Sequence, residues 1–184
     1  MPIQLSPEML NDFRVYEGTG AAYLGIVDAT LPNIEAMTTA MSGSGIAGEY
    51  EQPQVGRTGS MTMTLTWRSA TAQALSVLRP IPQTLQLLGS VQMSSPALPA
   101  LAPSAVSGVT TSQQIKIIVR CTPKNVALGT FTPGEVMDTT TEFEVTALSI
   151  FIDGVPRVII DKINAAYIID GVDYLAKTRS DVGL

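Results

Sequence analysis

The chain has 184 residues, 45% of them hydrophobic, and a formal net charge of −5, with no histidine and one cysteine. This length and apolar content can bury one substantial core, so a single domain over residues 1–184 is expected rather than disorder or several domains. Without histidine and with one thiol, zinc sites, imidazole-assisted serine or cysteine catalysis and disulfides within the chain are excluded.

The N-terminus and the charge bear on location and partners. No run approaches the roughly 18 to 20 apolar residues of a membrane helix, and the first residues lack the basic start and apolar block of a secretory signal. We therefore expect folding in the cytoplasm and no membrane anchoring. The acidic balance argues against a basic groove that grips nucleic acid. It is compatible with a wall past which nucleic acid slides without sticking.

Two strands and a turn are predicted near the N-terminus. Residues 13–17 (FRVYE) and 21–31 (AAYLGIVDATL) flank the sequence Gly18-Thr19-Gly20. Because glycines favour tight hairpin turns, the two strands are expected to pair with each other.

A long segment without clear periodicity follows, at residues 36–59. Its residues 43–48 (GSGIAG) have the G-x-G-x-x-G spacing of a dinucleotide site. The context is wrong, because no buried strand precedes them and Pro53 lies where a helix should run. A long flexible loop is the simpler reading, and its mixture of apolar and charged residues favours an extended hairpin that orders on a partner. The candidate contact residues are Met37, Met41, Ile46, Tyr50, Val55 and Arg57.

The cleanest strand pattern comes next, at residues 61–67. Apolar Met61, Met63, Leu65 and Trp67 alternate with Thr62, Thr64 and Thr66. A period of two places the apolar set on a core and the threonines on an outward, hydroxyl-rich face.

The main helix is predicted at residues 69–80 (SATAQALSVLRP), with Ser69 or Thr71 as N-cap and Pro80 as the stop. Strands are then expected at residues 84–93 and 113–121. The segment between them, residues 94–112, is rich in proline, alanine and serine and has no period, which is typical of a long loop or insertion. Another loop is predicted at residues 123–138.

The C-terminal part contains Ile-Asp-Gly-Val twice. Asp153-Gly154 is predicted to turn a strand at residues 139–152 back into a strand at residues 156–164. Asp170-Gly171 ends the strand-like residues 165–169 and leads into a short helix candidate at residues 172–180. In total we expect seven to nine strands, mostly antiparallel, in a mainly β sandwich or barrel with one main helix and a short C-terminal helix.

The candidates for chemistry each have a simpler structural reading. Glu142 and Glu144 could be imagined as an acid and base pair, but carboxylates on an outer strand face are far commoner. The aspartates at 153, 161, 170 and 173 include two turn residues and form no D-x-D-x-D-G calcium loop. Cys121 follows an apolar strand and is expected to be a small buried hydrophobe. No catalytic, cofactor-binding or metal-binding residue is therefore predicted, and the chain is not expected to be an enzyme.

A resemblance to a known family appears in the last fifty residues. An Asp-Gly hairpin at 153–154 is followed by the Ile-Asp-x-Ile-Asn strand of residues 160–164, a Gly-Val-Asp-x-Leu turn at residues 171–175 and a terminal Gly183-Leu184. This order resembles the end of the major tail tube protein of contractile-tailed bacteriophages and of phage-tail-like bacteriocins. The upstream element order is also similar, although residues 94–112 are longer and richer in proline and alanine than the corresponding connection.

The resemblance implies a β subunit that forms hexameric rings, stacked into a hollow tube inside a contractile sheath. It implies that the segment at 36–59, with the six contact residues given above, meets the neighbouring ring. Strands of the inner wall must show alternate residues to the lumen, and the face of Thr62, Thr64 and Thr66 is the first choice for that surface. Contacts between subunits are expected from the terminal segment; their residues are Ile163, Tyr167, Val172, Tyr174, Leu175 and Leu184.

The partners implied by the resemblance are other copies of the chain, the sheath, baseplate or tube-initiator proteins, a terminator and a tape measure protein. DNA would pass through the lumen of a phage tail without specific binding, and the particle would assemble in the bacterial cytoplasm and leave by lysis. Two alternatives stay open: the tube protein of a secretion or extracellular contractile injection system, and a β-sandwich binding module. The binding module would require clustered exposed aromatics, and aromatic residues make up only 5% of the chain.

Overall fold

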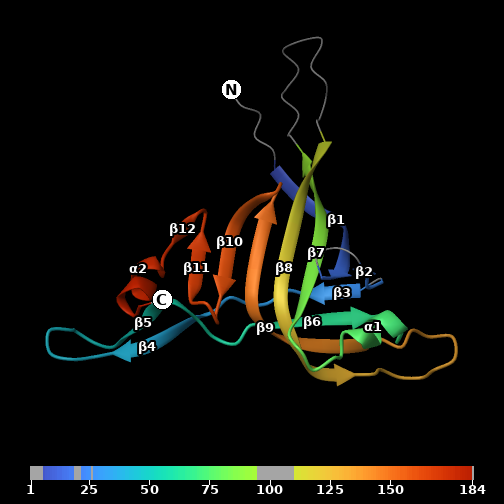
Figure 1. Ribbon diagram of the computed structural model, residues 1–184, viewed down its shortest axis with the longest axis horizontal. Helices are drawn as coiled ribbons and strands as arrows, with labels where there is room; N and C mark the ends of the chain where they lie inside the picture. Colours follow the sequence, from blue (N-terminus) through green and yellow to red (C-terminus); the bar gives the residue numbers. More distant parts are fainter. Residues whose placement is uncertain (1–5, 19–21, 26, 95–109, 184) are drawn as a thin grey trace, which may run out of the picture.

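The structure is a computed structural model that describes residues 6–18, 22–25, 27–94 and 110–183 (Figure 1). Twelve strands and two short helices lie within these residues. In chain order they are β1 (Ser6–Glu17), β2 (Ala22–Tyr23), β3 (Val27–Thr30), β4 (Ala36–Met41), β5 (Tyr50–Thr58), β6 (Thr62–Trp67), α1 (Ala72–Ser76), β7 (Gln83–Ser94), β8 (Thr110–Ala127), β9 (Thr139–Ile152), β10 (Val155–Asp161), β11 (Ala166–Ile169), β12 (Val172–Asp173) and α2 (Ala176–Asp181). The expected class, mainly antiparallel β with two helices, is confirmed.

One large antiparallel sheet dominates the molecule. Its strand order is β12-β11-β10-β9-β8-β7-β1-β2. The long strands hold together through rows of apolar residues that lie opposite one another, such as Leu87, Ile117, Ile150 and Val158 across β7, β8, β9 and β10. Cross-strand apolar pairs of this kind are the main source of stability in a sheet.

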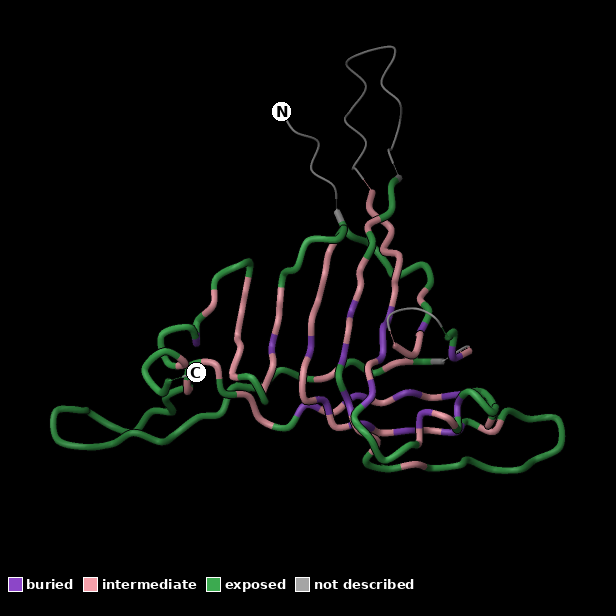
Figure 2. The backbone as a smooth tube through the Cα atoms, viewed as in Figure 1, coloured by how far each residue is buried: buried purple, intermediate pink, exposed green. Residues whose placement is uncertain are grey.

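The two halves of strand β9 pair with different strands, so the sheet branches at β9. Its C-terminal half pairs with β10, whereas its N-terminal half pairs with β6, which in turn pairs with β3. The β3–β6 pair packs its apolar face against the long strands, and the core lies between the two layers. Figure 2 shows the buried residues gathered in the lower part of the molecule in that view, where the layers overlap.

The predicted alternation in β6 is confirmed. Met63 and Leu65 are fully buried and Trp67 almost so, while Thr62, Thr64 and Thr66 are only partly buried. The opposite face of β6 therefore stays polar, as a period of two requires.

Both Asp-Gly pairs form two-residue hairpin turns. Ile152 pairs with Val155 around Asp153-Gly154, and Ile169 pairs with Val172 around Asp170-Gly171. All four turn residues have positive φ, between 47° and 83°, the geometry that favours Asp-Gly in this kind of turn. The first hairpin is confirmed; the second turn was expected to lead into a helix, and the structure inserts the short strand β12 before α2.

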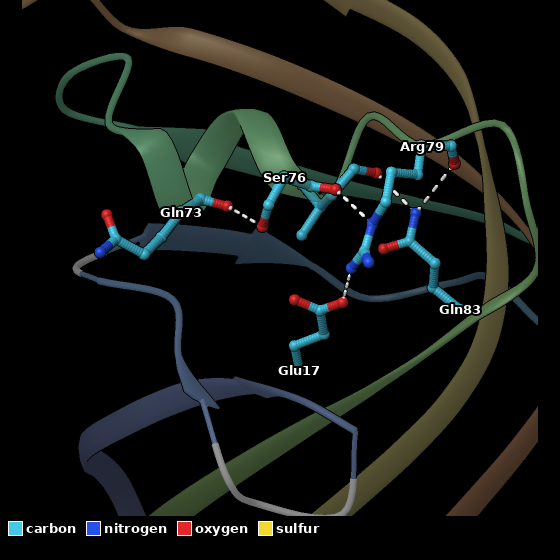
Figure 3. A network of polar contacts seen from close by, with 6 residues as sticks. Glu17, Gln73, Ser76, Arg79 and Gln83 are labelled. Carbon is cyan, nitrogen blue, oxygen red and sulfur yellow. Dashed lines mark hydrogen bonds and ion pairs between the residues drawn. The ribbon is translucent and has the colours of Figure 1, made fainter.

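Helix α1 is shorter than predicted. It covers five residues, with the Thr71 hydroxyl accepting a hydrogen bond from the Ala74 N–H at 3.1 Å. Its C-terminal end is closed by the Gln83 amide, which donates to the carbonyls of Val77 and Arg79, and Arg79 forms an ion pair with Glu17 (Figure 3). These side-chain contacts satisfy the carbonyls that further helical turns would have used.

Several strand boundaries also differ from the predictions. Strand β1 begins at Ser6 rather than at residue 13, and the predicted strand 21–31 is split into β2 and β3, of which only β2 pairs with β1. Strand β8 continues to Ala127, into the loop that was predicted at residues 123–138. Its pairing with β9 shifts register between Pro123 and Asn125. A proline is tolerated there because a bulge removes the need for its missing N–H.

Candidate assembly interface

The segment predicted to meet a partner forms a separate two-stranded sheet, β4–β5, that projects from the body of the molecule (Figure 1). Every residue of β4 is exposed. Residues 43–48 form the tip, where Gly45 and Gly48 have positive φ. No helix follows this glycine-rich sequence, so it lacks the helix N-terminus on which a dinucleotide site depends.

The hairpin carries apolar side chains on a stem held by polar ones. Thr38 donates to Glu51 at 3.2 Å, and Gln54 donates to Thr39 at 2.7 Å. The predicted contact residues are all exposed; the apolar ones are Met37, Met41, Ile46, Tyr50 and Val55, between 40% and 67% exposed, and Arg57 accompanies them. So much exposed apolar surface on one small element is typical of a surface that binds another protein.

The base of the hairpin rests on the C-terminal segment. A cavity of about 330 Å³ lies at this junction and is bordered by Val55, Gly56 and Arg57 of the hairpin and by Tyr167 and Tyr174 of the C-terminal segment. The structure therefore brings together two sets of residues that the sequence treated as separate interfaces.

The predicted subunit-interface residues divide into two groups. Ile163, Val172 and Tyr174 are between 54% and 73% exposed, and Tyr167 is partly buried, with its ring edge-on to Tyr174 at 6.4 Å. Leu175, in contrast, is only 9% exposed and packs against its own hairpin. Leu184 lies outside the described residues.

The threonine face of β6 continues onto β9. Thr62 lies opposite Glu144 and Thr64 opposite Glu142. Both glutamates pair with lysines, Glu142 with Lys124 at 3.3 Å and Glu144 with Lys162 at 3.7 Å. The two carboxylates thus belong to a polar strand surface with neighbouring cations.

The same side of the sheet continues from β9 onto β8, because Thr122 of β8 also lies opposite Glu144. In β8, Gln114, Lys116 and Arg120 alternate with core-facing residues and so point away from the core. Lys116 lies over the ring of Phe151 at 5.8 Å, on the neighbouring strand. This open face of the long sheet was not predicted as a candidate site.

The sequence also did not single out two uncovered apolar features. Where the long strands extend beyond β3, a groove of about 270 Å³ is lined almost wholly by apolar residues, among them Leu10, Phe13, Leu31, Leu87, Val91 and Ile115. Phe131 is 90% exposed, in the connection between β8 and β9. The sequence offered one indication that Phe131 is exposed: it is an aromatic residue inside a loop rich in glycine, proline and threonine.

The aspartates considered for calcium serve turns and local ion pairs. Asp161 accepts hydrogen bonds from the backbone of Ile163 and Asn164, both at 2.9 Å. Partial burial raises its pKa, but these bonds and the nearby Arg120 outweigh that effect, so the pKa lies below its ordinary value. Among the described residues, no group of three or more candidate ligands could hold a metal ion.

Cys121 is fully buried in the core, as predicted. Burial raises the pKa of its thiol to about 12, which leaves it protonated and poorly nucleophilic at neutral pH.

Within the part of the chain that the structure describes, no helix has the length and apolar character needed to cross a membrane.

The described residues form a mainly antiparallel β fold with exposed apolar residues on the β4–β5 hairpin and in the C-terminal segment. The sequence matches the model of the family described as phage tail tube protein FII over residues 7–183, so the chain belongs to that family. It is a structural component of a phage tail tube or a related tube, as the C-terminal resemblance implied.

Comparison with solved structures supports the fold. The chain is similar to a subunit in a structure described as the sheath/tube terminator of PVC, an extracellular contractile injection system, in its extended state. The TM-score is 0.52 at 11% sequence identity, and the match covers 79% of this chain and 97% of the other. No curated protein sequence matches the chain significantly.

Proposed function

We propose that this tail tube protein assembles as hexameric rings that stack into a hollow conduit. DNA would pass through it in a phage, or ions in a bacteriocin. The observation that carries the proposal, beside the family, is the β4–β5 hairpin, which is already formed in the single chain and presents apolar residues to solvent. Burial of such residues on a neighbouring ring is favourable, at roughly 25 cal/mol per Å² of apolar surface.

The hairpin is the proposed contact between rings. Its residues Met41, Ile46 and Tyr50 lie in the outer part, whereas Met37, Val55 and Arg57 lie toward the base. A projecting element reaches a neighbour without bringing the subunit bodies together. The stacked arrangement of the rings would follow from it.

Contacts within a ring are proposed to join opposite edges of the long sheet. On the outer side of β1, β2 covers only Tyr16 and Glu17 among the described residues, so most of that edge lacks a strand partner there. The far edge carries Ile163, Val172 and Tyr174, and Leu184 is expected to join them. A head-to-tail contact between two different edges closes into a ring when the rotation fits, and it also covers edges that would otherwise aggregate.

The lumen is proposed to be lined by a polar β face with little net positive charge. The threonine face of Thr62, Thr64 and Thr66 is our first choice, because its hydroxyls and lysine-paired glutamates offer DNA few free cations. The open face around Gln114, Lys116 and Arg120 is the competing surface. A wall that repels or ignores phosphate lets DNA pass without binding.

The remaining partners are proposed by family: a contractile sheath outside, an initiator on the baseplate, a terminator, and a tape measure protein inside the growing tube. Assembly would occur in the bacterial cytoplasm, with release of the particle by lysis.

The test is electron microscopy of the purified protein over a concentration series. We expect rings at low concentration and hollow tubes with sixfold end views above a threshold, because stacking requires several weak contacts at once. Particles of single-subunit size at every concentration would contradict the proposal.

A further inference from the structure

We propose that the C-terminal segment of residues 171–182 is a latch that fixes the direction of the β4–β5 hairpin, and that Leu175 is its key positioning residue. The inference rests on the proposed function, in which the hairpin contacts the next ring. It goes further by assigning Leu175 to hairpin orientation within one subunit rather than to a contact between subunits.

Strand pairing does not fix the orientation of the hairpin relative to the large sheet. In the described residues, β4 and β5 form a sheet of their own, and neither pairs with a strand of the large sheet. Its two stems are tied to each other, where the Gly59 N–H donates to the Glu35 carbonyl at 2.9 Å. A two-stranded hairpin is at best marginally stable alone, so packing at its base decides where it points.

Leu175 supplies that packing. A Cβ atom placed on Gly56 would lie 2.6 Å from both Cγ and Cδ1 of Leu175. The branched end of the leucine therefore rests directly on the hairpin backbone. Gly56 is suited to this contact in two ways, because its φ of +67° disfavours other residues and because it has no side chain to displace the leucine.

Leu175 is itself held firmly on the body. Its N–H donates to Asp173 Oδ1 at 3.0 Å, and Asp173 forms an ion pair with Arg179. Arg179 also donates to the Ala165 carbonyl at 2.8 Å, next to β11. The Tyr174 N–H donates to the Tyr167 carbonyl at 2.9 Å. Each bond joins the latch to itself or to β11, so the position of Leu175 follows that of the large sheet.

The consequence is a hairpin that is oriented before it meets a partner. Ordering an element in advance removes part of the entropic cost of association. If only a tenth of the hairpins pointed correctly, the apparent affinity for the next ring would fall about tenfold.

The test measures hairpin direction and tube growth separately. Spin labels are placed at Ala40→Cys on β4 and Gln114→Cys on β8, both exposed positions, while the buried native Cys121 stays unlabelled. With Leu175 intact we expect a narrow distribution of distances between the labels. With Leu175→Ala the distribution should broaden, and the concentration needed for tubes should rise about tenfold.

Matched variants guard against general damage. Lys177→Ala truncates an exposed side chain of the same segment, whose ion pair with Asp181 is also exposed, and should change neither measurement. Leu175→Met, in contrast, should give the narrow distribution of the intact protein. Should Leu175→Ala fail to fold, Leu175→Val offers a milder truncation for the same measurements.

The outcomes separate the two ideas. A narrow distribution in folded Leu175→Ala or Leu175→Val would overturn the latch, whatever the tubes do. A broadened distribution with tube growth at the normal concentration would support the latch and remove the hairpin from the contact between rings.

Discussion

At the residue scale, the carboxylates that were candidates for chemistry take part in turns and ion pairs. Asp153 accepts the Gln114 N–H at 2.9 Å, and Asp161 caps the turn that follows β10. The carboxylates that sequence reasoning weighed as an acid and base pair each have a lysine close by. This is consistent with a structural protein of the tail tube family.

Asp173 gives a testable pH dependence. A hydrogen bond from Arg179, assisted by the Leu175 N–H, holds the pKa of the Asp173 carboxyl below its ordinary value. The folded state therefore binds this proton less readily than the unfolded state. The stabilisation is complete above the ordinary pKa of about 4 and is lost as the pH falls through the lower folded value.

We expect the amide of Leu175 to lose hydrogen-exchange protection only when the pH falls through the lowered pKa of Asp173, below the ordinary value of about 4, since its acceptor is then neutralised. Protection factors measured by NMR between pH 7 and pH 3 would follow this. In Asp173→Asn the protection should be low throughout, without the acid step. Equal protection profiles in the two proteins would contradict the assignment.

At the element scale, the sequence located most strands because their side chains alternate or their turns are marked. The Asp-Gly pairs and the threonine alternation are local signals, and the structure follows both. The ends of elements were less well predicted. Strand β8 continues past Cys121 because β9 pairs with it as far as Ala127. The residues of β8 alone do not indicate where that partner strand ends.

The hairpin offers a prediction at this scale. Removing residues 40–51, whose ends pair with each other, should leave a folded subunit, because the β4–β5 sheet is separate from the main one. We expect single rings that do not elongate, measured by sedimentation and electron microscopy. Replacing Thr39 and Gln52, which pair on the stem, with alanines is the matched control and should leave elongation nearly normal. Tubes of ordinary length after the deletion would show that rings stack by another surface.

At the scale of the whole molecule, two polar regions are candidates for the lumen wall: the threonines of β6 and the part of β8 around Gln114 and Lys116. Both regions face away from the core, and β9 connects them, since Glu144 lies opposite Thr62 of β6 and Thr122 of β8. Two further apolar surfaces are exposed in the single subunit: the groove beside Phe13 and the side chain of Phe131.

Cysteine labelling distinguishes the two regions. Thr64→Cys and Gln114→Cys each add one reactive thiol, while native Cys121 is silent because burial raises its pKa to about 12. In assembled tubes without sheath, a maleimide on a polymer too wide for the lumen should label Gln114→Cys and spare Thr64→Cys. Both should react in the free subunit. The reverse pattern in tubes would move the lumen to the open face of the long sheet.

The sequence by itself determined the local features: a β protein without imidazole or paired thiols, strands marked by alternation, turns marked by Asp-Gly, and the C-terminal order that pointed to the family. These depend on neighbours along the chain. The tertiary structure decided how β9 divides between β6 and β10, which apolar residues stay uncovered, and that Leu175 rests on Gly56. Such contacts join segments that lie far apart in the sequence and meet only through strand pairing and sheet twist. No short pattern of residues could therefore have predicted these contacts.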